Sequence, residues 1–431
     1  MTFVRDPDGD RAGYYCRNTR HGGVSVSAER VSTASHVLFG RLRPEVAVFL
    51  YFDPEPLDRM RILRVAPWIY PDTKGGGDYH VHAMSRDQAA MGHDVTVLTT
   101  REDDSLPRVE ETHGYTIYRV DPGVTLLGND VSPAVARFLW HADREGFDVL
   151  HAHSHCYFTT NLAALKRRLG DIPLAITNHG LYSQNAPERL FTLYLKTLGR
   201  WTFDQADVVF CYTEVDRERV RELGVSSRIE VVANGIDTER FTPEGPGSES
   251  IDAAGPVVLF VGRFADGKRP WLAIEAFADV LETHPDAELY LCGEGALRER
   301  LEERVAELEI GASVTFLGQV PYDEMPRVYR SGDVLVLPSR AEGVPRTVLE
   351  AMASGTRVVT GELEHVRPVL GERDAVVDVT DRAATAAAIT AGIGQAEVVD
   401  GGREGVVGSH RWRDTVERTT AVLDGLRGNH F

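Results

Sequence analysis

The chain has 431 residues, of which 42% are hydrophobic and 8% aromatic, so it is long and apolar enough to form two globular domains. Its formal net charge of −18 excludes a general nucleic-acid binder, because clustered lysine and arginine are needed to neutralise phosphates. Only four of the 47 basic residues are lysines. This scarcity, beside 65 acidic residues, is typical of a halophilic archaeon or a GC-rich bacterium. We favour the halophilic archaeon, with codon bias as the alternative.

The cysteines are few and widely spaced, and they form no CxxC pair: Cys16, Cys156, Cys211 and Cys292. This pattern indicates a reduced, cytoplasmic protein rather than a disulfide scaffold. No run approaches the roughly 20 apolar residues that a membrane-spanning helix needs. We therefore expect a cytoplasmic protein, and peripheral contact with the inner face of the membrane stays open.

Residues 1–59 differ from the rest of the chain, because they lack a sustained apolar period apart from the short run at 46–52. At Met60 the sequence changes to "MRILRVAPW", which is the pattern of a buried strand. We predict that 1–59 is an extension outside the fold and that Met60 is the functional start. A genuine N-terminal subdomain is the alternative.

The segment 60–241 alternates between strand and helix patterns. Strands are predicted at 61–68, 93–100, 147–154, 173–180, 206–213 and 228–235, and helices at 78–92 and 162–170. Connections of this length imply right-handed crossovers and a parallel sheet covered on both faces. The sequence therefore predicts a doubly wound α/β domain.

A linker rich in Pro, Gly and Ser follows at 242–256, and a second alternation occupies 257–407. Strands are predicted at 256–262, 287–293, 313–318, 333–339 and 356–360, and helices at 270–283, 296–309, 322–331 and 345–354. A last amphipathic helix is predicted at 410–426. The fold class is thus α/β, with two doubly wound, Rossmann-like domains whose ligands bind beyond the carboxyl ends of the strands.

The stretch "FVGRFADGKRP" at 260–270 combines two cations with the end of a strand. Arg263 emerges where the strand gives way to a loop, and Lys268 stands just before a helix that opens with Pro270. Two cations beside the N–H groups of a helix N-terminus favour the binding of a diphosphate. The alternative is a pair of solvated surface cations.

The stretch "EGVPRTVLEAMASG" at 342–355 places two glutamates around the start of a helix. Glu342 lies in the loop after a strand, Pro345 suits the first turn of the helix, and Gly355 ends it. Glu350 follows Arg346 by four residues. The alternative interpretation of these last two is an ion pair on the helix surface, worth at most about 0.5 kcal/mol.

These stretches, together with "CGEGALRERLE", "VVANGIDTERFTP" and "WIYPDTKGGGDYHVHAMSRDQAAMGHDVTVLTT", resemble the retaining glycosyltransferases of family 4, which have the GT-B fold. The resemblance covers residues 60–425. It implies that Glu342 faces the donor sugar, that Glu350 binds the ribose, and that Arg263 and Lys268 hold the diphosphate. It also implies that His179 lies near the reacting sugar.

The resemblance further implies a set of donor contacts made by backbone and small side chains. The glycine-rich turn lets the backbone approach the donor or the acceptor, and a turn after a strand lies near the nucleobase. The residues concerned are Gly76, Gly77, Gly318, Val344, Arg346 and Thr347. Pro345 and Arg346 depart from the glycine and the aliphatic residue that are common in the family, as does Asp78 from the usual glutamate.

We therefore expect a hexosyltransferase that uses a nucleotide-diphospho-sugar, needs no metal or other cofactor, and acts on a glycan, a lipid-linked or a small-molecule acceptor. Two rivals remain open. One is a metal-dependent hydrolase that uses His151, His153 and His155, whose spacing suits metal ligation. The other is a non-catalytic binder of nucleotide sugars. Donor base, donor sugar, acceptor and linkage are not predicted, because they depend on the shape of the pocket.

Overall fold

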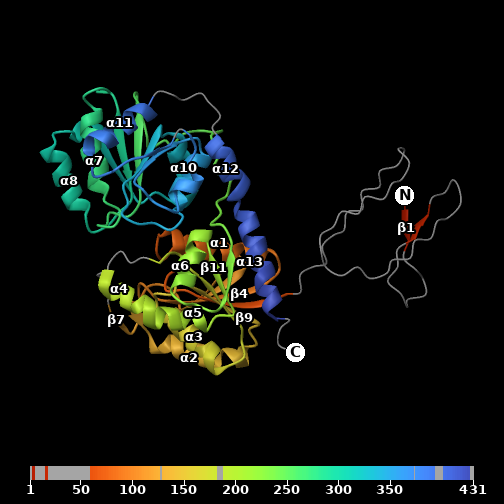
Figure 1. Ribbon diagram of the computed structural model, residues 1–431. Coiled ribbons are helices and arrows are strands. Elements are labelled where there is room, and N and C mark those ends of the chain that lie inside the picture. The colour runs from red at the N-terminus through yellow and green to blue at the C-terminus, as the bar shows by residue number, and fades with distance from the viewer. Residues whose placement is uncertain are drawn as a thin grey trace. The chain divides into compact units, whose positions relative to one another are not determined.

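The computed structural model describes residues 2–4, 15–17, 59–126, 129–181, 188–372, 374–393 and 401–427 (Figure 1). The chain divides after Leu57 into two units. In the first unit, β1 (Thr2–Val4) pairs antiparallel with β2 (Tyr15–Arg17), a pairing that the sequence analysis did not predict. The prediction that 1–59 is an extension otherwise lies outside the described residues.

The second unit begins with an eight-stranded sheet in the order β12-β11-β10-β9-β3-β4-β6-β5. Its strands are parallel except for β5, which pairs antiparallel with β6. The strands are β3 (Arg61–Val65), β4 (Asp94–Thr100), β5 (Val109–Thr112), β6 (Tyr115–Val120), β9 (Val149–His153), β10 (Leu174–Thr177), β11 (Val208–Cys211) and β12 (Arg228–Val231). A separate antiparallel pair is formed by β7 (Val124–Leu126) and β8 (Asn129–Val131).

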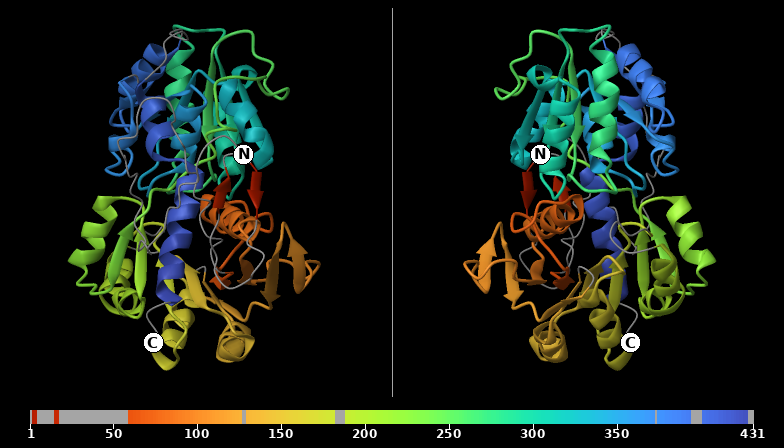
Figure 2. Two further views of the ribbon diagram at one scale, coloured as in Figure 1. Left: turned by 90° about the vertical axis from the view of Figure 1, so that its right-hand side faces the viewer. Right: turned by 90° about the vertical axis from the view of Figure 1, so that its left-hand side faces the viewer.

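Helices lie on both faces of this sheet (Figure 2). They are α1 (Gly76–Ala90), α2 (Pro133–Glu145), α3 (Phe158–Leu169), α4 (Glu188–Tyr194), the π-helical turn η1 (Leu195–Gly199), α5 (Arg200–Asp204) and α6 (Glu214–Glu222). Successive residues of β3 belong to different cores, because Ile62 packs with Val95 and Val97 while Leu63 packs with Leu150. A strand that is buried on both faces reads as a continuous apolar run.

The second sheet has the order β15-β14-β13-β16-β17-β18 and is parallel throughout. Its strands are β13 (Val257–Val261), β14 (Glu288–Cys292), β15 (Val314–Gly318), β16 (Val334–Leu337), β17 (Arg357–Thr360) and β18 (Ala375–Val376). Its helices are α7 (Pro270–Val280), α8 (Arg298–Glu307), α9 (Met325–Arg330), α10 (Arg346–Ala353), α11 (Arg382–Gly392) and α12 (Gly401–Ser409), with short turns η2 (Gly311–Ser313), η3 (Tyr322–Glu324) and η4 (Arg367–Val369). The predicted fold class, two doubly wound parallel domains, is confirmed.

The last helix, α13 (Trp412–Arg427), packs against α1 of the first domain (Figure 1). The indole Nε1 of Trp412 donates to Asp87 at 2.6 Å, and Gln88 Nε2 donates to Thr420 at 2.8 Å. Helix α13 is therefore fixed to the helix that follows the glycine-rich turn.

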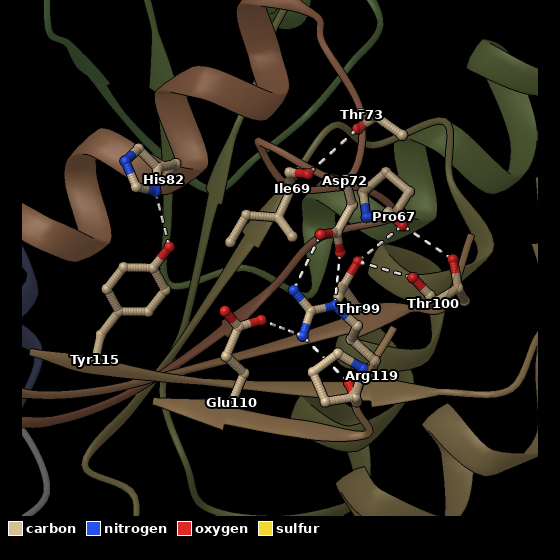
Figure 3. Close-up of polar contacts among 11 residues, drawn as sticks. Pro67, Ile69, Asp72, Thr73, His82, Thr99, Thr100, Glu110, Tyr115 and Arg119 are labelled. Carbon is tan, nitrogen blue, oxygen red and sulfur yellow. Dashed lines mark hydrogen bonds and ion pairs between the residues drawn. The ribbon is translucent and has the colours of Figure 1, made fainter. Parts of the chain in front are cut away.

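Several predicted boundaries were wrong in the first domain. The strand predicted at 61–68 ends at Val65, because the hydroxyls of Thr99 and Thr100 both donate to the carbonyl of Pro67 at 3.0 Å and hold 66–68 as a loop (Figure 3). The helix predicted to start at 78 begins at Gly76. The sequence analysis also assigned no elements between 101 and 146, where β5 to β8 and α2 form.

A buried ion pair fixes the loop between β3 and α1. Arg119 on β6 donates through Nε and Nη2 to both carboxylate oxygens of Asp72, at 2.6 and 3.0 Å, and its Nη1 lies 2.7 Å from Glu110 (Figure 3). The Arg119 and Asp72 side chains are 1% and 4% exposed. This bidentate contact holds the loop that delivers Gly75, Gly76 and Gly77 to the site.

Candidate donor and acceptor site

A cavity of about 650 Å³ lies at the carboxyl ends of both sheets. Loops after β3, β9, β10 and β11 line it from the first domain, and loops after β13, β14, β15 and β16 line it from the second. Doubly wound sheets bind ligands at this edge. Of the eleven residues predicted for the site, ten line this cavity.

The exception is Gly318, at the end of β15. It has a φ of +68° and its carbonyl accepts a hydrogen bond from Gly293, whereas its neighbour Gln319 lines the cavity. Gly293 is needed because a Cβ there would lie 1.9 Å from the Gly262 carbonyl. The close approach of three strand ends is therefore what brings Arg263 and Gln319 to the same cavity wall.

One of the two predicted cations contacts the first glutamate, and the other, Arg263, lines the same cavity. Lys268 Nζ forms an ion pair with Glu342, and the two side chains are 14% and 5% exposed. The neighbouring Arg269 donates to the carbonyls of Pro338 and Ser339 at 2.8 and 2.9 Å, which ties the loop after β13 to the loop after β16. Two sequence stretches some eighty residues apart thus form one charged site.

Arg346 and Glu350 form an ion pair at 3.4 Å, but not on the surface, because their side chains are 7% and 4% exposed. The interpretation as a surface pair is therefore wrong. Both Glu350 oxygens also accept hydrogen bonds, from Tyr322 at 2.7 Å and from Tyr329 at 3.1 Å. The carboxylate expected to bind ribose is thus already engaged inside the second domain.

Arg346 joins the two domains. Its Nη1 donates to the Gly235 carbonyl at 2.8 Å, its Nη2 donates to the Tyr322 hydroxyl at 2.9 Å, and its guanidinium lies over the rings of Tyr79 and Trp412. The rings of Tyr79 and Tyr322 are 3.7 Å apart between centroids. A planar guanidinium suits such stacked contacts, so arginine at this position is a structural connection as well as a charge.

The start of α10 offers further polar groups to the cavity. Pro345 is the N-cap residue rather than part of the first turn, and the helix starts at Arg346. The first-turn N–H groups of a helix lack carbonyl partners within it. The hydroxyl of Thr347, which lines the cavity, is buried without a hydrogen-bond partner, while the carbonyl of Val344 accepts from Asn234 at 3.0 Å.

His179 follows β10 and faces the cavity from the first domain. Its Nδ1 is 2.8 Å from the Tyr212 hydroxyl and its Nε2 is 3.1 Å from His153 Nδ1. Burial lowers the pKa of His179 to about 4, so the ring is neutral near pH 7. The Gly343 loop lies close by, because a Cβ there would be 3.1 Å from the His179 carbonyl.

The other histidines of the strand end do not form a metal site. His151 contacts Arg64 at 3.3 Å and Thr177 at 2.8 Å, whereas His155 lies against the ring of Phe203. Among the residues that the structure describes, no group of three or more His, Cys, Asp or Glu side chains could hold a metal ion. The hydrolase that we considered therefore has no support in this part of the chain.

The glycine-rich turn lies between Arg346 of the second domain and His179 of the first. A Cβ at Gly76 would lie 3.8 Å from Arg346, and one at Gly77 would lie 3.9 Å from His179. A Cβ at Gly75 would come within 2.8 Å of the Asp78 carboxylate. Burial raises the pKa of Asp78, although a hydrogen bond with Thr73 and the charge of Arg263 oppose that rise.

Two family descriptions match the chain in succession. Residues 74–240 match Glycosyltransferase Family 4, and residues 243–395 match Glycosyl transferases group 1. A D-inositol 3-phosphate glycosyltransferase from Acidothermus cellulolyticus is 30% identical over 396 residues, covering 81% of this chain and 85% of that protein. The chain belongs to glycosyltransferase family 4.

Solved structures of other glycosyltransferases show the same GT-B fold. Sucrose-phosphate synthase from Thermosynechococcus elongatus has a TM-score of 0.69 at 21% identity, and the match covers 85% of this chain and 99% of the synthase chain. Anabaena HepE, in complex with UDP and glucose, has a TM-score of 0.68 at 17% identity, and the match covers 85% of this chain and 100% of the HepE chain. The GT-B fold that the resemblance implied is confirmed.

In this family 4 chain, sequence reasoning missed the aromatic side chains of the site. Tyr322, Tyr79 and Tyr212 line the cavity and contact Glu350, Arg346 and His179. Tyr322 follows Pro321 in the turn after β15, so its place at the sheet edge could have been found from the strand pattern. Its contact with Glu350 could not, because 28 residues separate the two.

Proposed function

We propose that the chain transfers a hexosyl group from a nucleoside-diphosphate sugar to a glycan, a lipid-linked or a small-molecule acceptor, with retention of the anomeric configuration. The observation that carries the proposal is that Arg263 and Lys268, in the loop after β13, line one cavity with Glu342 and the start of α10, and that Lys268 pairs with Glu342. The complex of HepE with UDP and glucose supports a nucleotide-sugar donor.

Charge stabilisation supplies the chemistry in this proposal. As the bond between the sugar C1 and the phosphate oxygen breaks, negative charge develops on the diphosphate and positive charge on the sugar ring. Arg263, Lys268 and the first-turn N–H groups of α10 stabilise the diphosphate. Glu342 orients the sugar and stabilises its positive charge. A new bond forms between C1 and the acceptor oxygen on the same face, and the leaving phosphate oxygen takes the acceptor's proton.

The ion pair between Lys268 and Glu342 suits this role. An incoming diphosphate offers the ammonium a second anionic partner, so the lysine bridges the glutamate and the donor. With two cations and a helix N-terminus at the diphosphate, we propose that transfer needs no metal ion.

The three described cysteines are free, in keeping with a cytoplasmic reaction.

The first experiment identifies the donor by thermal-shift measurements with UDP-, GDP- and ADP-sugars, since the bound nucleotide stabilises the folded chain. Proton NMR of the product then reports the anomeric configuration, and a chelator tests the need for metal. Inversion, or loss of turnover with the chelator, contradicts the corresponding part of the proposal. Donor binding without turnover on any acceptor favours the non-catalytic binder.

Lys268→Ala and Glu342→Ala are expected to abolish transfer while circular dichroism shows a folded chain. Arg300→Ala, which removes an exposed cation of α8 outside the cavity, is the matched control and is expected to keep full turnover. Near-normal turnover in both site variants would exclude this assignment of the site.

A further inference from the structure

Exposed apolar side chains gather on the first domain. All ten large hydrophobic side chains that the described residues expose lie between Met91 and Leu198. Six of them lie on four helical segments, and we call them the leucine face: Trp140 on α2, Leu165 and Leu169 on α3, Leu190 and Leu193 on α4, and Leu198 on η1.

These helices lie next to one another. Helix α3 contacts α2 and α5, and η1 contacts both α4 and α5 (Figure 1). The exposed fractions are large, 67% for Trp140 and 60% for Leu193. Single exposed leucines are normal on a protein surface, but a set confined to adjacent helices marks an interaction surface.

The leucine face is basic, although the whole chain is strongly acidic. The twelve residues of α3 include three cations and no acid, residues 188–204 include three cations and two acids, and α2 includes two of each. Some of this charge is neutralised, because Arg167 pairs with Asp207 at 2.7 Å and Arg200 pairs with Asp204 at 3.4 Å. The exposed cations between the leucines are Arg168, Arg189 and Lys196.

Helix α4, which carries Leu190 and Leu193 of the leucine face, also lines the cavity. Leu190, Phe191 and Tyr194 of α4 line its first-domain side, together with Trp68 and Tyr157, whose rings are 5.0 Å apart between centroids. The leucine face is therefore continuous with an aromatic wall on the side of the cavity opposite Arg263 and Lys268.

We propose that the leucine face docks on a membrane surface that contains anionic lipids. Helices that expose leucine and tryptophan beside lysine and arginine lie in the lipid interface, where the apolar side chains enter the acyl boundary and the cations meet the headgroups. Protein interfaces are enriched in tryptophan and arginine as well, so a second copy of the chain is the alternative occupant that the experiment below tests. Among the described residues no helix is long and apolar enough to cross a membrane.

Docking in this way brings the aromatic wall of the cavity to the lipid surface. Among the acceptor classes proposed above, it favours the lipid-linked one, and this step rests on the proposed function. The docking itself does not depend on that function, because vesicle binding can be measured without any turnover. A failure of the docking proposal can therefore be told apart from a failure of the proposed glycosyl transfer.

The experiment is flotation of the full chain with vesicles of phosphatidylcholine alone and of phosphatidylcholine mixed with phosphatidylglycerol. We expect binding to the mixed vesicles only, and release as salt is raised. Leu193→Ser with Leu198→Ser should lower the partition coefficient at least about tenfold. Arg189→Glu with Lys196→Glu should lower it by about fivefold for each cation lost.

The matched control is Val109→Ser with Val124→Ser, which removes two exposed valines, 49% and 69% exposed, from β5 and β7 outside the leucine face. Its vesicle binding should equal that of the unchanged chain, and melting curves should show that every variant is folded. A chain that stays unbound with mixed vesicles overturns the proposal, and so does an equal loss in the control. A dimer that the leucine variant abolishes would instead assign the surface to a second copy of the chain.

Discussion

Glu342 and Lys268 each depend on the other, because Glu342 is buried, Lys268 is largely buried, and each is the other's ion-pair partner. A buried charge without its partner keeps its desolvation cost and loses the attraction that offset it. The two residues that we propose to act on the donor are therefore also expected to stabilise the second domain. A single substitution of either one is expected to change both donor turnover and stability.

A double-mutant cycle separates these two properties. Lys268→Met and Glu342→Gln are each expected to lower the free energy of unfolding, the first by about 3 kcal/mol because it strands the carboxylate. The double variant should lose clearly less free energy of unfolding than the two single variants lose together, since it removes both charges. Urea unfolding measures the three values. Strictly additive losses would show that the pair does not couple.

Tyr322 competes for the carboxylate that the resemblance assigns to ribose, since its hydroxyl donates to Glu350 and accepts from Arg346. Tyr322→Phe removes both contacts, so the Glu350 oxygen that still lies 3.4 Å from Arg346 Nε can accept a hydrogen bond from the donor. We expect the KM for the nucleotide sugar to fall by about fivefold, the equivalent of one net hydrogen bond. Initial rates measure it, with Tyr329→Phe as the matched variant that removes the other tyrosine hydroxyl from Glu350. A higher KM for Tyr322→Phe would mean that the hydroxyl contacts the donor.

At the scale of elements, the loop between β3 and α1 illustrates how distant strands position a site. The loop carries the glycines that face Arg346 and His179, yet it is held by Arg119, which lies on β6. Asp72→Asn is expected to lower the free energy of unfolding by about 3 kcal/mol, because Arg119 loses a buried partner. Glu110→Gln is the control, with under about 1 kcal/mol expected, since Glu110 is 39% exposed. Calorimetry of the two variants decides, and equal losses would contradict the role of Asp72.

The buried histidines near the ends of β9 and β10 predict that the free energy of unfolding depends on pH. Burial lowers the pKa of His80, His151, His153 and His179 well below 6.5, so these rings are neutral when folded and protonated when unfolded in mildly acidic solution. Unfolding then takes up protons. Stability is full above pH 6.5 and decreases as the pH falls toward 4, by about 1.4 kcal/mol per pH unit for each histidine.

Urea unfolding between pH 7.5 and 5 measures this slope. Substitution of the exposed His113 by glutamine should leave the slope unchanged, because it leaves all four buried histidines in place. A stability that does not change over this range would show that the buried histidines titrate normally.

The sequence predicted the elements that have long apolar runs and the residues that stand at strand ends. Glu342 and Lys268 were expected at this edge in this way, because the carboxyl ends of parallel strands meet there, whereas His179 came from the family resemblance; all three line the cavity. The edge strand β5 was missed because it has no apolar run, with Val109 exposed and two glutamates following it. The contacts of Tyr322 and Arg119 were missed because hydrogen bonds between distant elements leave no periodic trace in a sequence.

At the scale of the whole molecule, the formal charge of −18 opposes folding through repulsion between acidic residues. Salt screens this repulsion, since the Debye length falls from about 10 Å at 0.1 M to about 3 Å at 1 M. We expect the melting temperature at pH 7.5 to rise by about 5 °C between these concentrations of potassium chloride. Near the isoelectric point of about 5.3 the rise should largely disappear, because the net charge is then close to zero. Differential scanning calorimetry at the two pH values measures these melting temperatures. If the composition reflects codon bias alone, the melting temperature should depend on salt no more than that of an ordinary protein. A melting temperature that is independent of salt at pH 7.5 would remove the physical basis for the halophilic interpretation.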